Sequence, residues 1–182
     1  MVRARSMDVW IGAVLGLVWS TTAWSGETVP GGYRAIAAEY DIPYTILYAF
    51  ALTESVRGLN DNRIRRPWPW TLNVAGRGYF YSSREAAWNA LNRFIAHGEQ
   101  SIDIGLMQVN WKYHKGKLGN TWRALDPYHN LKIAAMILQD CFHKRHDWWA
   151  SVGCYHSPAN TVRAQGYQLR VVRHWRRLET NG

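Results

Sequence analysis

The residue most clearly suited to chemistry in this chain is Glu54, an acidic side chain that comes shortly after an uncharged apolar segment. Residues 46–52 contain no charged side chain, and at helical spacing Glu54 falls on the same stripe as Leu47, Phe50 and Ala51. Partial loss of water and the negative end of the helix dipole both disfavour a charged carboxylate there, so its pKa is expected to be raised. Folding does not require an acid at this place, and we interpret Glu54 as catalytic.

The elements that position this acid follow from helical spacing, caps and turns. A helix is predicted over 44–55, after a first helix over 33–40. Residues 71–81 carry strand-forming residues on both sides of Ala-Gly-Arg-Gly and predict a small β-hairpin. A short strand with a turn is expected over 102–110, and further helices over 82–97, 130–141, 148–155 and 161–178. The predicted fold class is mainly α (α+β): a helical single domain with a small inserted β-hairpin.

Composition limits the class of protein without choosing a function. The chain has 182 residues, of which 47% are hydrophobic and 19% charged, which is typical of one folded domain and not of a disordered segment. Its formal net charge of +9 suits anionic polymers such as cell-wall glycan, anionic lipid or nucleic acid. The 11 Trp and 10 Tyr suit sugar-binding clefts, but aromatic cores use the same residues.

The N-terminus predicts an export signal. Arg3 and Arg5 precede an apolar segment over 9–19, and small residues at 23–25 suit a signal peptidase. We expect residues 1–25 to be the signal peptide, residues 26–32 a linker, and residues 33–178 the folded domain. An uncleaved N-terminal anchor is the alternative.

The two cysteines agree with export. Cys141 and Cys154 both lie in the expected mature chain, and an even cysteine count in an oxidising compartment predicts a disulfide between them. Two buried free thiols are the alternative.

Three segments resemble those of a known family. Residues 42–55, ending in Glu-Ser, residues 105–110 with Gly-Leu-Met-Gln, and residues 148–155 are similar to the motifs of the lysozyme-like lytic transglycosylases with an SLT domain. The likeness is greatest to small exported members that accompany conjugation, pilus and secretion machines. It implies a lysozyme-like fold, Glu54 as the catalytic acid and base, and a periplasmic location, with or without an inner-membrane anchor.

Two departures from the family pattern concern the shape of the cleft. The family follows its motif tyrosine with Asn-Ala-Gly, whereas this chain has His-Ser-Pro at 156–158. The link between the Glu-Ser and Gly-Leu-Met-Gln motifs, residues 56–101, is also longer than usual.

The resemblance implies cleavage of the β-1,4 bond between N-acetylmuramic acid and N-acetylglucosamine. Glu54 protonates the departing oxygen, and the sugar's own 6-hydroxyl then attacks the anomeric carbon to form a 1,6-anhydro product. Asp103 leaves an alternative open, because Asp-x-Gly-x-x-Gln-x-Asn also resembles animal-type lysozymes, in which that Asp is the second carboxylate. A hydrolase using Glu54 and Asp103 is then feasible. Otherwise Asp103 holds the loop.

The remaining substrate-binding candidates surround these acids. Gln108 and Asn110 offer amides for N-acetyl and hydroxyl groups, although Asn110 suits a structural role equally well. Ser55 is expected to hydrogen-bond near Glu54 or the sugar, or else to be solvated. Tyr155 is expected to place its hydroxyl near Glu54, and Met107 to pack against the cleft floor.

The predicted helix 161–178 is basic. Its apolar side is expected to include Val162, Leu169 and Val172. The basic side carries Arg163, Arg170, Arg173, Arg176 and Arg177. These arginines form either a solvated face or a surface that attracts the carboxylates of peptidoglycan.

No cofactor is expected. His143 and His146 lack a nearby third ligand, and the sequence contains no phosphate loop, nucleophile elbow or dinucleotide fingerprint. The expected partners are peptidoglycan glycan strands and, by resemblance, components of conjugation, pilus or secretion systems. Nucleic acid is not an expected partner. Association with a membrane is expected only if the N-terminus stays uncleaved. A non-catalytic wall-binding assembly protein is the alternative of another class.

Overall fold

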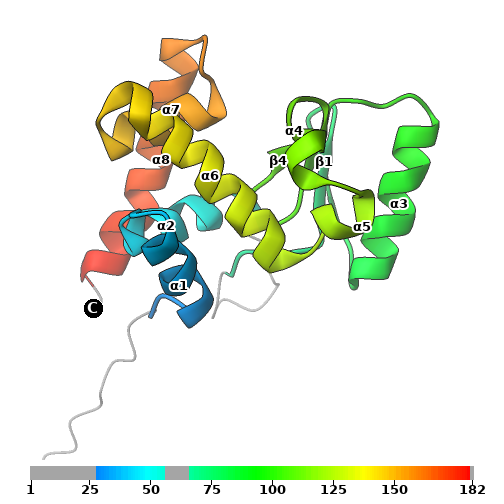
Figure 1. The fold of residues 1–182 in the computed structure, drawn as a ribbon, viewed down its shortest axis with the longest axis horizontal. Helices are drawn as coiled ribbons and strands as arrows, with labels where there is room; N and C mark the ends of the chain where they lie inside the picture. Colours follow the sequence, from blue (N-terminus) through cyan, green and yellow to red (C-terminus); the bar gives the residue numbers. More distant parts are fainter. Residues whose placement is uncertain (1–27, 56–65, 181–182) are drawn as a thin grey trace, which may run out of the picture.

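The computed structural model describes residues 28–55 and 66–180. The predicted signal peptide and the first ten residues of the segment 56–101 lie outside these residues. The described chain consists of a helical part and a part built around a sheet (Figure 1). The helices are α1 (Gly31–Glu39), α2 (Tyr44–Ser55), α3 (Arg84–Ala96), α4 (Trp111–Leu118), α5 (Thr121–Ala124), α6 (Pro127–Arg145), α7 (Trp148–His156) and α8 (Thr161–Thr180). The strands are β1 (Thr71–Val74), β2 (Arg77–Phe80), β3 (Ile102–Ile104) and β4 (Val109–Asn110). The mainly α prediction is confirmed.

Helix α2 is the centre of the helical part. Its residues 46–52 are each at most 6% exposed, and the helix contacts α1 and α8. The predicted start and end of this helix are confirmed. Burial extends beyond the stripe of Leu47, Phe50 and Ala51, because the helix is buried on nearly all sides before it reaches Glu54.

The sheet is larger than the predicted hairpin. Strands β1 and β2 form that hairpin, and β3 and β4 extend it into an antiparallel sheet of order β2-β1-β3-β4. The register pairs Asn73 with Asp103 and Asp103 with Asn110, so these three residues form one row across the sheet. Helix α3 begins at Arg84, two residues after the predicted start, because the Ser83 hydroxyl caps it by accepting from the Ala86 N–H.

Helix α6 joins the two parts. It contacts α1 and α7 on the helical side and α4, α5 and β4 on the sheet side, and it runs between them in Figure 1. Asp126 caps it by accepting from the His129 N–H, and Pro127 occupies its first turn, so the helix begins earlier than the predicted residue 130. Helices α4 and α5 were not predicted. In α4 only Leu118 is buried, so apolar spacing gives no signal there.

Helix α8 turns a different side inward from the predicted one. Val162 and Leu169 are 77% and 63% exposed, whereas Tyr167, Val171 and Leu178 are buried. The reason lies in the close approach of α7, where a Cβ at Gly153 would stand 3.1 Å from the carbonyl oxygen of Ala164. That approach turns the side of Ala164, Tyr167, Val171 and Leu178 toward the core.

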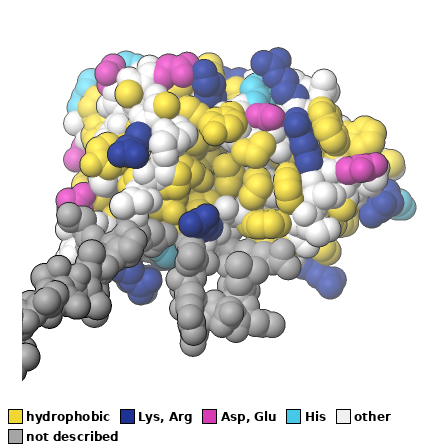
Figure 2. Space-filling model, turned by 90° about the horizontal axis from the view of Figure 1, so that it is seen from below, with side chains coloured by type: hydrophobic (Ala, Val, Ile, Leu, Met, Phe, Trp, Pro, Cys, Tyr) yellow, Lys and Arg dark blue, Asp and Glu magenta, His cyan; other side chains and the backbone are white. Residues whose placement is uncertain are grey.

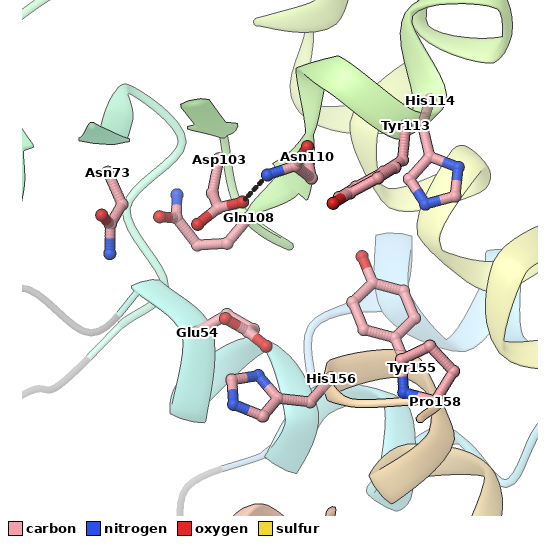
Figure 3. A pocket seen from close by; sticks show the side chains of 10 residues that line it. All are labelled: Glu54, Asn73, Asp103, Gln108, Asn110, Tyr113, His114, Tyr155, His156 and Pro158. Atoms are coloured by element: carbon pink, nitrogen blue, oxygen red, sulfur yellow. Dashed lines mark hydrogen bonds between the residues drawn. The ribbon is translucent and has the colours of Figure 1, made fainter. Parts of the chain in front are cut away.

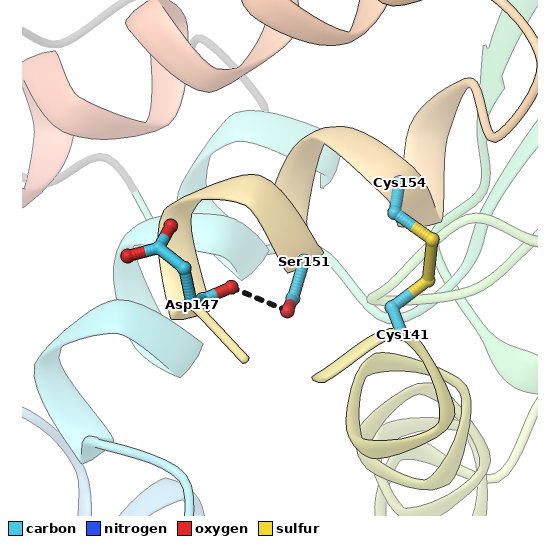
Figure 4. Close-up of a disulfide and its surroundings, with 4 residues drawn as sticks. All are labelled: Cys141, Asp147, Ser151 and Cys154. Carbon is cyan, nitrogen blue, oxygen red and sulfur yellow. Dashed lines mark hydrogen bonds between the residues drawn. A yellow bond between two sulfur atoms is a disulfide. The ribbon is translucent and has the colours of Figure 1, made fainter. Parts of the chain in front are cut away.

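A disulfide joins Cys141 near the end of α6 to Cys154 in α7, as predicted (Figure 4). The Cα atoms are 6.0 Å apart and the cysteines are 13 residues apart in sequence. Closing a loop of this length contributes roughly 3 kcal/mol in the chain-entropy model. The bond therefore fixes α7 to the helix that joins the two parts.

The surface is partly apolar. On the face seen in Figure 2, hydrophobic side chains occupy much of the middle, with Lys and Arg side chains around them. None of the helices in the described ranges is sufficiently long and apolar to cross a bilayer.

Candidate active site

A pocket of about 610 Å³ lies where the helical part meets the sheet. Two groups of residues face each other across it (Figure 3). We call the first the helical wall; it consists of Glu54, Tyr155, His156 and Pro158. We call the second the sheet wall; it consists of Asn73, Asp103, Gln108, Asn110, Tyr113 and His114. The structure thus brings together five residues predicted from sequence: Glu54, Asp103, Gln108, Asn110 and Tyr155.

Glu54 is held in its protonated form. It lies one residue before the end of α2, directly after the buried part of that helix. Burial raises the pKa of Glu54 to about 8, and the negative charge of Asp103 adds to this rise. A hydrogen bond from Tyr167 and the positive charge of Arg170 act in the opposite direction. The carboxyl group therefore carries its proton at neutral pH, as a general acid requires.

Tyr167 is the functional residue that the sequence reasoning missed. Its hydroxyl donates a hydrogen bond to Oε1 of Glu54, and its side chain is 2% exposed. The sequence reasoning assigned such a contact to Tyr155, but the Tyr155 hydroxyl donates instead to the carbonyl oxygen of Met107 at 3.0 Å. The signal was present in the spacing of Ala164, Tyr167 and Val171, which follow one face of α8.

Asp103 belongs to a polar row in the sheet wall. It lies on β3 between Asn73 on β1 and Asn110 on β4, and its Oδ1 accepts from Nδ2 of Asn110 at 2.7 Å. Burial raises the pKa of Asp103, and the bond from Asn110 lowers it. The side-chain oxygens of Asn73 and Asn110 are buried with no partner in the described part of the chain. They are acceptors available to the hydroxyl or amide groups of a ligand.

The loop between β3 and β4 is shaped by the buried residue Asn130 of α6. Its side chain accepts from the Met107 N–H at 2.9 Å and donates to the carbonyl oxygens of Ile104 at 2.8 Å and Ala124 at 3.2 Å. Gly105 has a φ of +82°, and a Cβ there would lie 2.7 Å from Cγ of Asn130. Only glycine fits this loop, which explains the first residue of Gly-Leu-Met-Gln.

Of the other predicted residues, only some have side chains that line the pocket. Gln108 lines it while its amide donates to the Gly105 carbonyl oxygen at 2.8 Å, so the side chain is fixed in place. Met107 is fully buried, and its backbone rather than its side chain is tied to Tyr155 and Asn130. Ser55 is buried and turned back to the carbonyl oxygen of Ala51, away from the lining of the pocket.

His156 and Tyr113 complete the two walls. The His156 ring stacks on Tyr167, with the ring centres 4.1 Å apart, and burial followed by the charges of Arg170 and Arg163 lowers its pKa. His156 therefore lies directly beside the hydrogen bond between Tyr167 and Glu54. Tyr113 is 75% exposed and offers its ring to a ligand from α4, a helix the sequence did not predict.

The described residues contain no group of three or more His, Cys, Asp or Glu side chains arranged to hold a metal ion. The site offers one protonated carboxyl group, a second acid at a polar wall, fixed amides and an exposed aromatic ring. This set suits acid-assisted cleavage of a bond in a polar, ring-shaped substrate.

Comparison with known proteins gives one match. The family model described as the transglycosylase SLT domain matches residues 33–171, which is most of the chain. No curated protein and no solved structure matches the chain significantly. The match includes both walls of the pocket and Tyr167.

Proposed function

Since the chain belongs to the transglycosylase SLT domain family, whose substrate is peptidoglycan, we propose that it is a lytic transglycosylase in the strict sense. It cleaves the β-1,4 bond between N-acetylmuramic acid and N-acetylglucosamine and leaves a 1,6-anhydromuramic acid end. The observation that carries this proposal is the raised pKa of Glu54, about 8, in a pocket between a helical wall and a polar wall.

The reaction needs one carboxyl group that gives a proton and then takes one. In the first step the Glu54 proton passes to the departing glycosidic oxygen as the bond to the anomeric carbon breaks. In the second step the 6-hydroxyl oxygen of the same sugar bonds to that carbon, and its proton returns to Glu54. No water is consumed, and the enzyme ends in its starting state.

Tyr167 and Asp103 support both steps by acting on Glu54. The Tyr167 hydroxyl stabilises the carboxylate that exists between them, since it donates to Oε1. The negative charge of Asp103 favours the protonated form of Glu54 and also stabilises positive charge that develops on the sugar ring. Because these two effects act on the pKa of Glu54 in opposite directions, Glu54 can both give up a proton and take one back during the reaction.

A muramidase-type hydrolase is the second candidate, and one observation favours it. Asp103 lines the same pocket as Glu54, as a second catalytic carboxylate would. In that case water replaces the 6-hydroxyl, and the product has a reducing end. The hydrogen bond from Asn110 that fixes Asp103 suits either candidate.

Mass spectrometry of muropeptides separates these functions. Purified sacculi are digested with the mature protein and, in parallel, with Glu54→Gln. Anhydro-muropeptides from the wild type and none from the variant support the proposal. Reducing-end muropeptides identify the hydrolase. If a folded wild type releases neither product while it sediments with sacculi, a wall-binding assembly protein is the better description.

The cellular part of the proposal extends this activity. We place the mature chain in the periplasm, free or anchored to the inner membrane, where it opens the wall locally for an envelope-spanning conjugation, pilus or secretion machine. Support comes from the signal-like sequence of residues 1–25 and from the resemblance described above. Cell fractionation tests the location, because a chain found only in the cytoplasm would contradict it.

A further inference from the structure

A second pocket, of about 290 Å³, lies between α2 and α8. We call it the arginine pocket; it is lined by Thr53, Arg170, Arg173, His174 and Arg177. The arginines are spaced by three and four residues along α8, which places their guanidinium groups on one side of the helix. Of the five arginines in the predicted basic face, these three converge on one pocket, whereas Arg163 and Arg176 lie outside its lining.

The arginines of this pocket take part in none of the ion pairs found between described residues. Those pairs join Arg84 to Asp126, Lys117 to Asp140 and Lys132 to Glu39. The Thr53 hydroxyl donates to the Ala49 carbonyl oxygen at 2.9 Å, so it is occupied within its own helix. Three guanidinium groups at one hollow repel one another, and a bound anion relieves that repulsion.

The arginine pocket is connected to the active site through α8. The guanidinium carbon of Arg170 lies 5.0 Å from the centre of the Tyr167 ring, and Tyr167 donates to Glu54. The charge of Arg170 reaches Glu54, whose pKa it lowers. From Tyr167 to Arg173 the helix rises about 9 Å at 1.5 Å per residue. Arg173 thus lies less than two helical turns along α8 from the residue that donates to Glu54.

We propose that the arginine pocket binds a carboxylate of the stem peptide carried by the glycan strand in the active site. This inference rests on the proposed function, because it names a further part of the same substrate. Stem peptides begin on the muramic acid ring and carry free carboxylates. About three extended residues span about 10 Å, which is comparable to the rise along α8 from Tyr167 to Arg173, and the proposal requires the stem to run from the sugar beside Glu54 to the pocket. Arginine binds a carboxylate through two parallel N–H···O bonds.

The shape of the site favours a peptide carboxylate over anionic lipid. A lipid surface requires cations on a face that a flat bilayer can approach, and it would use Arg163 and Arg176 as readily as the others. A hollow with three converging guanidinium groups next to the catalytic helix instead suits one small anionic group on a flexible chain. Binding to anionic membranes is the outcome that would replace this proposal.

Binding in the absence of turnover provides the first test. In the Glu54→Gln background, dissociation constants are measured for soluble glycan fragments with intact stem peptides and for the same fragments after an amidase has removed them. We expect peptide-bearing fragments to bind about tenfold more tightly, the scale of a few charge-assisted hydrogen bonds at a partly open site. Adding Arg173→Gln should remove most of this preference. Adding Arg176→Gln, which removes the same charge from the same helix outside the pocket, should retain it.

These outcomes separate the inference from the proposed function. If the preference for stem peptides is absent, or if Arg176→Gln reduces it as much as Arg173→Gln, the pocket does not bind the stem and the inference is wrong, whatever the reaction. If the preference is present but sacculi release no anhydro product, the proposed reaction fails and the pocket assignment survives. Arg173→Lys keeps the charge without the paired donors, and a partial preference in that variant supports the two-bond geometry.

Vesicles test the competing ligand. Wild type, Arg173→Gln and Arg176→Gln are each sedimented with phosphatidylglycerol vesicles and with neutral vesicles. If both substitutions weaken binding to phosphatidylglycerol vesicles equally, the attraction to lipid is diffuse and does not involve the arginine pocket. That result agrees with the stem peptide as the ligand of the pocket. A selective loss for Arg173→Gln, together with no stem-peptide preference in solution, would assign the pocket to lipid and overturn the inference.

Discussion

The two walls of the active site hold their acids by different means. Glu54, on the helical wall, lies in the last turn of a buried helix, and its side chain accepts a hydrogen bond from Tyr167. Asp103, on the sheet wall, stands in a polar row and accepts from Asn110. Burial is the largest cause of the raised pKa at both acids. In the proposed reaction the helical wall therefore governs proton transfer, whereas the sheet wall, through fixed amides and a shaped loop, governs how the sugar is placed.

The largest expected effect is on the helical wall. Glu54→Gln should lower the rate of muropeptide release by about a thousandfold, within the range that general acid catalysis contributes. Initial rates on purified sacculi measure this, with circular dichroism as the control for folding. A folded variant that retains a tenth of the activity or more would show that the helical wall does not supply the acid.

The next effect concerns the loop of the sheet wall. Gly105→Ala places a Cβ 2.7 Å from the buried side chain of Asn130 at a φ of +82°. We expect a loss of about 3 kcal/mol in the free energy of unfolding, from backbone strain and overpacking together. Gly98→Ala is the matched control, because its φ is +85° with open space around the Cβ; the strain alone costs roughly 1 kcal/mol. Equal losses in urea unfolding would mean that Asn130 does not shape the loop.

Asp103→Asn tests whether the two walls share the chemistry. The wild type should lose activity as pH rises through about 8, where Glu54 gives up its proton. Because the charge of Asp103 raises the pKa of Glu54, removing it should move this loss to lower pH. The rate below the transition should fall by about tenfold, equivalent to one such electrostatic interaction. A loss as large as that of Glu54→Gln would instead make Asp103 a catalytic partner.

Tyr167→Phe should have the smallest effect, and its direction is informative. The Tyr167 hydrogen bond lowers the pKa of Glu54, so its removal should move the loss of activity to higher pH. The rate should fall about threefold, as expected for one hydrogen bond. Tyr155→Phe is the control from the same wall, because its hydroxyl bonds to the Met107 carbonyl oxygen and not to Glu54. A shift in Tyr155→Phe equal to that in Tyr167→Phe would contradict the assignment.

Local patterns in the sequence were sufficient to predict the helical wall. The uncharged run before Glu54 predicted both the helix and the raised pKa, because a continuous apolar segment of that length is readable within the segment itself and indicates burial. The hairpin of β1 and β2 also follows from a local pattern and was predicted. The disulfide between Cys141 and Cys154 was predicted from an even number of cysteines in a chain expected to be exported.

Contacts between distant segments were not predictable in this way. The row of Asn73, Asp103 and Asn110 depends on the register of three strands, which no single segment fixes. The anchoring of the loop by Asn130 joins residues more than twenty positions apart. The buried side of α8 was misassigned because Val162 and Leu169 are more apolar than Ala164, although the small residue is the one that meets α7.

Two side chains join the walls directly. Tyr155 donates from α7 to the backbone of Met107, and Asn130 of α6 holds the same loop from below. Widening the cleft requires breaking these bonds, and the disulfide restrains α7 against α6 at the same time. In the proposed reaction we expect these contacts to limit how far the walls move, so that most of the entropy lost on binding is that of the glycan. The glycan strand is then expected to adopt the shape of the cleft rather than the reverse.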